Sequence, residues 1–472
     1  MKSAIFSGPD EARTTDRILT RFAHEGAEIC YEEDPVLSGL LESEYNRQSN
    51  VLAMVASSSL ADASVLACEG TVLTNVTAEG YPGRRFHGGC QFVDEVEQLA
   101  IDRAKCAFRA EYANVQPHCA SSANEIVMCS MLRPGSTILG MSLESGGHLT
   151  HGSKVSLSGQ YFNAVYYGVD EAGFIDYDQV LQLAKEHNPR LIICGTTSYP
   201  RAIDFGRFRN IADEVGAYLL ADITHIAGLV AAGFHQSPVN YAHFTTTCTH
   251  KQLYGPRGGL ILMGADAQTR VPDKNLTLSA LIQSAVFPFF QGAPAPGNIA
   301  AKARALARVA TPAFKVLAGR IVADAQALAE AFVSAGYKVV SGGTDNHIVM
   351  LDLSSQGMTG IVAQRALEDN SIIVNKNKIP GDRKGPLVTS GIRLGTNSVA
   401  CRGLEPWDME ECAQLMDWVL TSTKSLGDTE YQLDQKVGKS VRSAVHGLCR
   451  RFPIPGYPLI SLPVHTKVPQ SA

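Results

Sequence analysis

Lys251 is the residue whose type and position first suggest chemistry. It ends the stretch TTTCTHK and is followed by the glycine-broken turn QLYGPRGG. A lysine at the carboxyl end of a buried strand faces the crevice where α/β proteins bind ligands. A desolvated amine there can form a Schiff base with an aldehyde, and pyridoxal phosphate is the obvious aldehyde. Because a single lysine at a strand end is usually only a solvated charge, other residues must support this interpretation.

Pyridoxal phosphate needs a carboxylate for its pyridinium nitrogen and a flat group over its ring. Asp222 ends the run YLLAD, and His225 lies three residues further on. A buried acid needs a partner, although Asp222 could instead cap a helix. His148 follows a glycine pair in SLESGGHLTHG, so its ring can approach a ligand closely. We expect Asp222, His225 and His148 to share one crevice with Lys251.

The cofactor also needs a cup for its phosphate. The stretch QPHCASSANEIVM indicates a turn of small residues that opens an apolar helix. A helix N-terminus binds anions because its first amide groups are free. Alone this is a weak signal, because many helices start in this way. The predicted phosphate and cofactor contacts are Ala120, Ser121, the amide of Ser122, Thr197, His250 and Gly292.

His148 and His151 also have the spacing of a metal-binding pair. Structural zinc sites need further Cys, His or carboxylate ligands. No cysteine or acidic cluster accompanies the two histidines in the sequence, so no metal site is predicted.

These residues need a scaffold, and the sequence between about 50 and 300 predicts one. RLIICGTTS reads as a buried strand and GRFRNIADEVGAY as a helix with Phe208, Ile211, Ala212 and Val215 on one face. YLLADITH, HFTTTCTHK and GGLILMG follow as strands. Alternating strands and helices predict an α/β fold with a mostly parallel sheet flanked by helices.

Three regions are predicted along the chain. Residues 1–48 are charged and read as a helical arm, and residues 49–300 form the large cofactor-binding domain. Residues 301–472 form a smaller C-terminal α/β domain. That domain starts with a long helix at GNIAAKARALARVA, contains the strands YKVVSGG, HIVMLDL, SIIVNKN and GIRLGT, and ends in a helical and then irregular tail.

Composition excludes several classes of protein. The 472 residues exceed one hydrophobic core, and 45% apolar with 18% charged residues is typical of globular proteins. The net charge of −5 gives no basic surface for nucleic acid. The apolar runs are too short to span a membrane. Eleven cysteines without a CxxC pair suggest reduced thiols, and we expect a cytoplasmic protein.

The ordered motifs resemble the serine hydroxymethyltransferase family from about residue 45 to 425. The resemblance implies a fold-type I pyridoxal phosphate enzyme that acts as a homodimer with shared active sites, on an amino acid together with an aldehyde or tetrahydrofolate. The motifs that carry it are AEGYPGRRFHGGCQFVDEVEQLAIDRAK, ANVQPH, GGHLTHG, ADITHIAGLVAAG, TTTCTHKQLYGPRGG, KVVSGGTDNH, VNKN and VTSGIRLGT.

The resemblance implies roles for individual residues. Lys251 matches the Schiff-base lysine, Asp222 the pyridinium partner and His148 the histidine stacked on the ring. His225 matches a residue near the phenolic oxygen of the cofactor. Glu79 matches the acid that handles protons on the hydroxymethyl group and the folate.

Substrate contacts are implied in the same way. Arg393 matches the arginine that clamps the substrate carboxylate, a task suited to its bidentate geometry. Ser57 and His250 match further carboxylate and phosphate contacts. The positions that match the surroundings of the folate are Leu143, Gly147, Leu149 and Asn377.

The chain departs from the family around the substrate. Thr77 replaces a tyrosine that normally reaches the phosphate of a neighbouring subunit. Phe86 and His87 replace two more tyrosines, one near the folate and one near the substrate carboxylate. Thr224 lies in DITH instead of DMAH, and FPFFQGAP brings Phe289 and Phe290 where glycines are usual. Neutral drift with repacking is one explanation, and an altered substrate is the other.

Two functions remain open at this stage. One is a hydroxymethyltransferase that breaks and forms the Cα–Cβ bond of serine, or of an α-substituted serine such as α-methylserine, with tetrahydrofolate. The alternative is a folate-independent threonine aldolase or transaldolase that joins a glycine carbanion to a larger aldehyde. A non-enzymatic, cofactor-binding regulator is disfavoured because Lys251, Asp222, His148 and Arg393 are all present.

Overall fold

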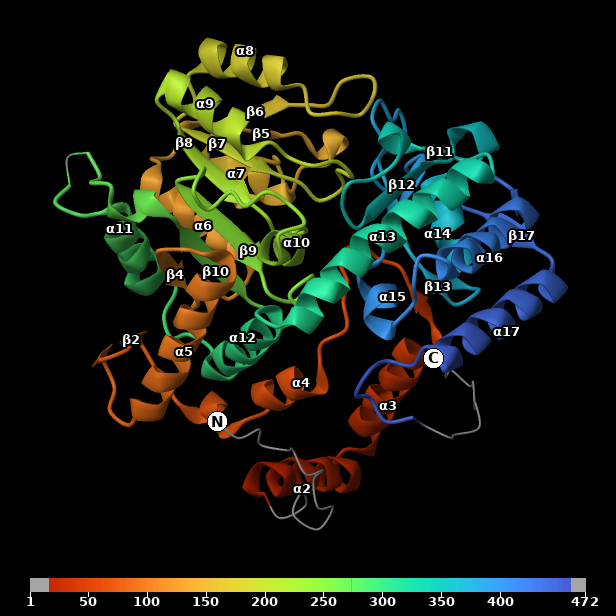
Figure 1. Ribbon diagram of the computed structural model, residues 1–472, viewed down its shortest axis with the longest axis horizontal. Coiled ribbons are helices and arrows are strands. Elements are labelled where there is room, and N and C mark those ends of the chain that lie inside the picture. The colour runs from red at the N-terminus through yellow and green to blue at the C-terminus, as the bar shows by residue number, and fades with distance from the viewer. Residues whose placement is uncertain (1–16, 273, 460–472) are drawn as a thin grey trace, which may run out of the picture.

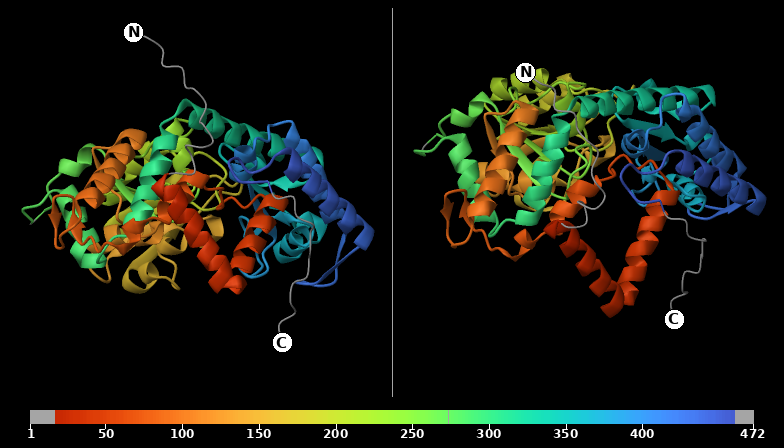
Figure 2. Two further views of the ribbon diagram at one scale, coloured as in Figure 1. Left: turned by 90° about the horizontal axis from the view of Figure 1, so that it is seen from below. Right: turned by 60° about the horizontal axis from the view of Figure 1, so that its bottom comes forward.

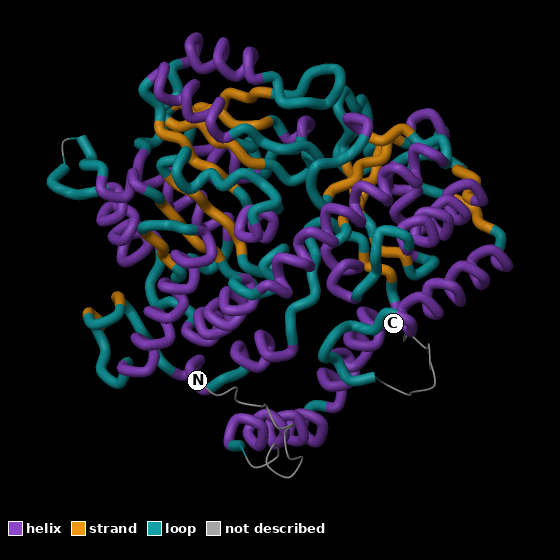
Figure 3. Tube along the Cα trace, viewed as in Figure 1, coloured by secondary structure: helices purple, strands orange, loops and turns teal. Residues whose placement is uncertain are grey.

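The computed structural model describes residues 17–272 and 274–459. Two sheets, each with its own helices, form the two halves of the molecule, and a long helix runs between them (Figures 1 and 3). The first 16 residues and the last 13, which belong to the predicted arm and tail, lie outside the described residues.

The larger sheet has seven strands and is mostly parallel. In spatial order they are β4 (Tyr112–Asn114), β10 (Gly259–Met263), β9 (Phe244–Cys248), β8 (Tyr218–Asp222), β7 (Leu191–Gly195), β5 (Thr137–Met141) and β6 (Asn163–Tyr167). Neighbours from β9 to β6 are parallel, whereas β10 is antiparallel to both β9 and β4. This confirms the predicted fold class.

Helices cover both faces of this sheet, so its strands are apolar on both sides. In β8, Leu219 and Ala221 belong to one apolar core and Leu220 to the other. The first core contains α5 (Gln91–Phe108), α8 (Tyr177–His187), α9 (Phe205–Val215), α10 (Ala227–Ala232) and α12 (Pro296–Val309), and the second contains α6 (Ala120–Met131) and α11 (Leu278–Ser284).

The helix α9 shows how the local sequence sets these elements. Asp204 caps it by accepting a hydrogen bond from the amide of Arg207, and Gly216 ends it in the left-handed conformation. Phe205, Phe208 and Ile211 are buried along one face, close to the stripe that the sequence predicts.

The smaller sheet is antiparallel. Its strands, in spatial order, are β11 (Lys338–Val339), β12 (Ile348–Asp352), β15 (Gly391–Gly395) and β14 (Asn375–Asn377). Its core also contains Leu52 and Met54, because β1 (Leu52–Ala53) pairs in parallel with β13 (Ile372–Ile373). The segment that opens the predicted large domain therefore packs on the small one. The helices of this half are α13 (Pro312–Ser334), α14 (Gly360–Glu368), α15 (Asn397–Arg402), α16 (Asp408–Ser422) and α17 (Gln435–Arg451).

The long helix predicted from GNIAAKARALARVA is interrupted. α12 ends at Val309, and α13 starts at Pro312 with Thr311 as its cap. Proline has no amide hydrogen and suits the first turn of a helix, so it starts a new helix here. α13 then runs between the two halves (Figure 1).

The described part of the arm consists of α2 (Ile18–Glu33) and α3 (Pro35–Asn50), which meet at an angle and project from the body (Figure 2). The helix α4 (Ala63–Glu69) follows after β1. The hairpin β2 (Gly80–Tyr81) and β3 (Arg84–Arg85) lies at the edge of the large half, and β16 (Thr423–Ser425) pairs with β17 (Tyr431–Leu433) in the small half. Within 17–272 and 274–459, no helix has the length and apolarity needed to cross a membrane.

Candidate active site

The carboxyl ends of four parallel strands bring the predicted site residues to one edge of the large sheet. β5 leads to the turn that carries His148, and β7 leads to Thr197. β8 ends at Asp222 and β9 leads to Lys251. Ligands of α/β proteins bind at this edge, where the strand order and the turns leave a crevice.

Lys251 and His225 are in direct contact. Their Nζ and Nε2 atoms lie 2.7 Å apart. Burial lowers the pKa of Lys251 below its usual range. Burial, and then the charge of Lys251, holds the pKa of His225 well below its usual value. The neutral imidazole therefore offers Lys251 a lone pair, and the lysine reaches its neutral, nucleophilic form more easily than an exposed one.

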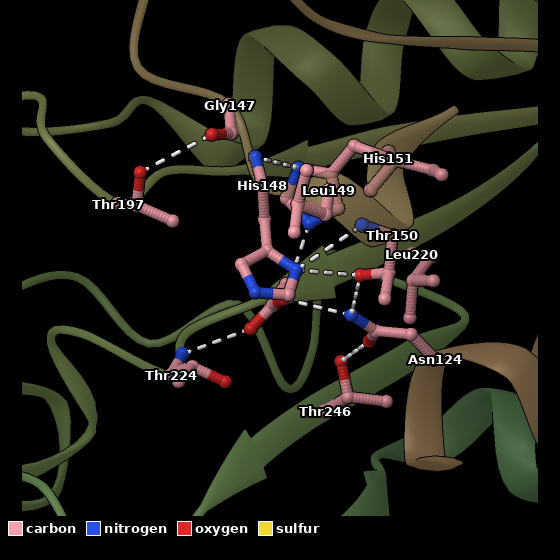
Figure 4. Close-up of polar contacts among 12 residues, drawn as sticks. Asn124, Gly147, His148, Leu149, Thr150, His151, Thr197, Leu220, Thr224 and Thr246 are labelled. Carbon is pink, nitrogen blue, oxygen red and sulfur yellow. Dashed lines mark hydrogen bonds and ion pairs between the residues drawn. The ribbon is translucent and has the colours of Figure 1, made fainter. Parts of the chain in front are cut away.

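Asp222 is buried, and its carboxylate is surrounded by hydrogen-bond donors, of which Asn124, His151 and Thr224 are labelled in Figure 4. Its Oδ2 accepts hydrogen bonds from Asn124 Nδ2 at 2.8 Å and from His151 Nε2 at 3.1 Å, and its Oδ1 accepts one from the amide of Thr224 at 3.0 Å. Burial alone favours protonation, but the hydrogen bond from His151 opposes it, and the pKa of Asp222 lies well below its usual range. The carboxylate stays ionised and can hold a proton on an aromatic nitrogen.

The ligating atoms of His148, His151 and Asp222 lie within 4.8 Å of one another. The sequence shows no cysteine or acidic cluster beside the two histidines, but the fold brings one carboxylate, Asp222, into contact with His151. The hydrogen bonds nevertheless occupy the ligating atoms: His151 Nδ1 accepts from the amide of His148, and His148 Nδ1 accepts from the amide of Thr150. The three side chains are thus oriented by each other.

The turn that carries His148 is fixed by Thr197. The hydroxyl of Thr197 donates to the carbonyl oxygens of Gly146 and Gly147, at 3.2 and 3.1 Å (Figure 4). A side chain at Gly147 would collide with the backbone, since its Cβ would lie 2.0 Å from the carbonyl oxygen of Met141. Burial lowers the pKa of His148 to about 4, so the ring is neutral and suited to lie over an aromatic ligand. Thr197, predicted as a cofactor contact, here orients the histidine.

Arg393 reaches the same edge from β15 of the small sheet. Its Nε donates to Asn375 Oδ1 at 3.1 Å, and its Nη1 donates to the carbonyl oxygen of Thr197. The residue is only 8% exposed, and burial lowers its pKa to about 10. No carboxylate within residues 17–272 and 274–459 pairs with this buried guanidinium, which favours binding of a substrate carboxylate.

The segment before Ser57 is fastened to the small half. The carbonyl oxygen of Ala56 accepts hydrogen bonds from His347 Nε2 at 3.1 Å and from Asn397 Nδ2 at 3.2 Å. The ring of His347 also stacks on that of His225, with the ring centres 6.1 Å apart. His347, which had no predicted role, connects the predicted carboxylate contact to the environment of Lys251.

The phosphate cup is centred on the first turn of α6. Cys119 caps the helix by accepting from the amide of Ser122, and Ser121 is half-buried beside it. His250 is tied by its carbonyl oxygen to the hydroxyl of Ser59 at 2.8 Å, and its Nδ1 is buried without a partner among the described residues. The amide of Ser122, a predicted phosphate contact, is therefore occupied, whereas the amides of Ala120 and Ser121 have no partner among the described residues. These two amides and the unpartnered nitrogen of His250 suit an anion.

Glu79, His87 and Gly292 form a second group. His87 Nε2 lies 3.3 Å from Glu79 Oε2, and a Cβ on Gly292 would lie 3.5 Å from Glu79 Oε1. In the part of the chain that the structure describes, no hydrogen bond or ion pair joins this group to Lys251. Phe86 is 73% exposed and Thr77 is exposed. Among the described residues, the structure thus shows no direct polar contact between these predicted residues and the lysine of the same chain.

The positions expected around the folate lie at the mouth of the crevice. Leu143 and Leu149 are about half exposed, at 45% and 47%, and Asn377 is half-buried on β14. Next to them, Lys378 Nζ of the small half and Glu144 Oε1 of the large half form an ion pair at 2.7 Å. The folate positions and this ion pair therefore lie where the two halves meet.

The other departures from the family also have clear places. Thr224 is buried, and its hydroxyl has no partner among the described residues, although its amide holds Asp222. Phe289 is 66% exposed at the end of the segment Ala285–Phe290, and Phe290 packs partly against the second core. Thr224 therefore lies next to Asp222, whereas Phe289 is exposed at the surface.

Comparisons with known proteins decide the family. A family model described as serine hydroxymethyltransferase matches residues 30–416. The chain belongs to the serine hydroxymethyltransferase family. A relative of that name from Alkalilimnicola ehrlichii is 50% identical over 422 residues, which is 89% of this chain and 96% of the relative. Relatives of the same name from Halorhodospira halophila and Cyanothece sp. are each 47% identical, over 90% and 91% of this chain.

Enzymes of this family use pyridoxal phosphate and tetrahydrofolate, and this chain is a transferase of that kind. Its residues fit pyridoxal phosphate. Lys251 offers an amine, Asp222 an ionised carboxylate and His148 a neutral ring. Buried polar atoms without a partner remain on Thr224, His225 and His250, where a polar ligand can satisfy them.

Proposed function

We propose that this protein transfers the hydroxymethyl group of serine, or of an α-substituted serine, to tetrahydrofolate. The observation that carries the proposal is the buried contact of Lys251 and His225 at the same sheet edge as Asp222, His148 and Arg393. The names of the relatives support this function, and none of them names a threonine aldolase or transaldolase.

Each residue has one task in this proposal. Pyridoxal phosphate, when bound, supplies an electron sink for the bond that breaks at the α-carbon of the substrate. Arg393 binds the substrate carboxylate and Ser57 adds a hydrogen bond to it. Asp222 keeps a proton on the pyridine nitrogen. Lys251 accepts and returns a proton at Nζ, with His225 fixing the position of that atom.

The proton on the substrate hydroxyl needs a separate carrier. Glu79 is the carboxylate available for it, since His87 Nε2 lies 3.3 Å from one of its oxygens and can share a proton with it. This task requires Glu79 to lie near the substrate.

The test of this function is a set of substrates assayed with and without tetrahydrofolate. Glycine release from serine, and alanine release from α-methylserine, are measured with purified enzyme. Folate should accelerate at least one of these reactions strongly, and Lys251→Ala should abolish both the reaction and the visible absorbance of the bound cofactor. Equal rates without folate, or acetaldehyde release from threonine as the dominant reaction, would contradict the proposal.

We also propose a homodimer with shared active sites. Glu79 and Gly292 lie in a group of their own, as expected if they serve the lysine of a second copy. The helix α2 contains no buried residue and exposes Ile18, Leu19, Phe22 and Ile29. Apolar side chains exposed in this number mark an interface.

Mixed variants test the shared site. Lys251→Ala and Glu79→Gln are each expected to be inactive. If the two variants are unfolded and refolded together, a shared-site dimer gives hybrids in which one of the two sites is intact. With random pairing of subunits, about a quarter of all sites are then intact. No recovery of activity, with hybrid formation verified by mass, would exclude shared sites. Light scattering measures the mass of the wild-type assembly.

The location we propose is the cytoplasm. All eleven cysteines lie in the described part of the chain and are unpaired. Reduced thiols in this number are typical of a reducing compartment. Fractionation of the producing cells, followed by detection of the protein in the cytosolic fraction, tests this location.

A further inference from the structure

Lys302 is a fully buried lysine to which the proposed reaction gives no role. It lies on α12 and is only 2% exposed. Its Nζ donates to three carbonyl oxygens, those of Val115 at 2.6 Å, Pro117 at 3.0 Å and Gly259 at 3.0 Å. A buried lysine of this kind needs an explanation, because taking its charge out of water is costly.

The contacts of Lys302 show that its ammonium form is present. A neutral amine has two N–H groups, whereas an ammonium has three donors and no lone pair. Three carbonyl oxygens at hydrogen-bonding distance match the three donors of the ammonium. Carbonyl oxygens solvate the charge but carry no opposite charge of their own.

No carboxylate in the described part of the chain forms an ion pair with Lys302. The acid that faces it is Glu97 on α5, whose two oxygens are taken by Arg85 Nη2 at 2.7 Å and Gln116 Nε2 at 2.8 Å. The other titratable group that faces it is the thiol of Cys119. Burial lowers the pKa of Lys302 to about 7, as expected for a cation without a direct counter-ion.

The ammonium group of Lys302 lies next to the turn that forms the phosphate cup. Pro117 is two residues before Cys119, which caps α6, and a Cβ on Gly259 would lie 2.4 Å from the carbonyl oxygen of Cys119. Gly258 closes the pocket from the other side, since its Cβ would lie 2.1 Å from Lys302 Cε. The ammonium is thus held between the turn that starts α6 and the start of β10.

We propose that Lys302 is the buried counter-charge of the cofactor phosphate, acting through the turn at residues 117–119 without touching the phosphate. The proposal rests on the assignment of the α6 N-terminus as the phosphate site. Lys302 is a positioning residue with an electrostatic effect.

Two effects follow from this arrangement. A dianion bound at the cup stabilises the nearby cation in a medium of low dielectric constant, so phosphate binding and protonation of Lys302 strengthen each other. Removing the charge should weaken ligands that carry a phosphate and leave pyridoxal, which lacks one, nearly unchanged. A purely structural role would weaken both kinds of ligand equally.

The experiment compares three ligands with the apoenzyme: pyridoxal phosphate, pyridoxal and inorganic phosphate. The variants are Lys302→Met, which removes charge and donors, and Lys302→Gln, which keeps an amide donor. Lys315→Met is the matched control, because it removes the same charge from an exposed position. We expect both Lys302 variants to bind the two phosphate ligands on the order of tenfold more weakly, with pyridoxal unchanged. Lys302→Arg should restore part of the affinity.

An equal loss for pyridoxal and pyridoxal phosphate, or no loss at all, would overturn the proposal. The variant Ser121→Ala tests the assignment of the phosphate site separately from the role of Lys302. If this variant binds inorganic phosphate normally, the assignment of the phosphate site fails. If Ser121→Ala weakens phosphate and the Lys302 variants do not, only the role of Lys302 fails.

If the uncharged Lys302 variants do not fold, a measurement on protein with Lys302 intact tests the proposed role of this residue. In a Lys251→Ala background, affinity for sulfate, a dianion that does not titrate in this range, should fall as the pH rises above about 7, where Lys302 loses its proton in the free enzyme. The other groups facing this region are Glu97, Cys119, Arg257 and His250, whose own pKa burial lowers to about 4. A flat affinity from neutral to alkaline pH would overturn the proposal.

Discussion

Replacing Asp324 by Asn should shift the free energy of unfolding, relative to wild type, in favour of the variant as the pH rises from about 5 to about 7. Asp324 lies on α13 and is fully buried, and both of its carboxyl oxygens lack a partner among the described residues. Burial raises its pKa from 3.8 to about 8, with Arg320 opposing the effect and Glu405 and Asp408 adding to it. The folded protein therefore holds a proton that the unfolded chain releases.

The sign and size of the pH effect on stability follow from the two pKa values of Asp324, 3.8 in the unfolded chain and about 8 in the folded protein. Between pH 3.8 and about 8 the unfolded state binds fewer protons than the folded state, so stability falls as the pH rises through this window. Each unit between 3.8 and pH 7 contributes about 1.36 kcal/mol, which gives ~4 kcal/mol at pH 7 as an upper bound. Asn is neutral in both states and removes this dependence.

The assay is urea unfolding of the two proteins at about pH 5 and about pH 7, at fixed protein and cofactor concentration. The free energy of unfolding of Asp324→Asn relative to wild type should rise by up to ~3 kcal/mol between the two pH values. Asp178→Asn is the control, because the Asp178 side chain is 96% exposed. Its difference from wild type should be the same at both pH values.

The pH dependence, and not the absolute stability, carries the test. The Asn amide has no partner at this site, so the variant can lose a constant amount of stability at every pH. A difference between variant and wild type that does not change from pH 5 to pH 7 would refute the argument that Asp324 is protonated in the folded protein.

Three further variants probe the site. His151→Phe removes a hydrogen bond to Asp222 and should lower kcat on the order of tenfold, with little change in KM. An unchanged kcat would show that Asp222 does not depend on the hydrogen bond from His151. Arg393→Lys should raise KM for the amino acid on the order of tenfold or more, because lysine loses the bidentate geometry, and steady-state kinetics measures this. His87→Tyr should shift the ratio of kcat/KM between serine and α-methylserine, and an unchanged ratio favours neutral drift at this position.

The sequence predicted the large sheet well because its strands carry strong local signals. Within the run 190–198, the segment 191–195 has no polar side chain, as expected for a strand covered on both faces, and it forms β7. The same alternation of strands and helices predicted the order in which Asp222 and Lys251 reach one edge. The proposed boundaries of the domains remain predictions, and β1 shows why: its partner β13 is more than 300 residues away in sequence, a pairing that no local pattern reveals.

The site was predicted less completely. Asn124, which bonds to Asp222, lies one turn into an apolar helix and gives no signal of its own. His151 was recognised only as a possible metal ligand, since its contact with Asp222 depends on how β5 and β8 lie in the folded sheet. Lys302 looked like any lysine of an amphipathic helix, and only the three carbonyl oxygens around it distinguish it.

The fastening of the segment at Ala56 to the small half has a consequence for motion. Ser57 follows Ala56, which is tied to His347 and Asn397, and Arg393 lies on the strand next to His347. Both predicted carboxylate contacts are therefore fastened to the small half, while Lys251 belongs to the large half. If the two halves rotate relative to each other, the grip on the carboxylate keeps its geometry, and only the separation between the anchored amino acid and the lysine changes.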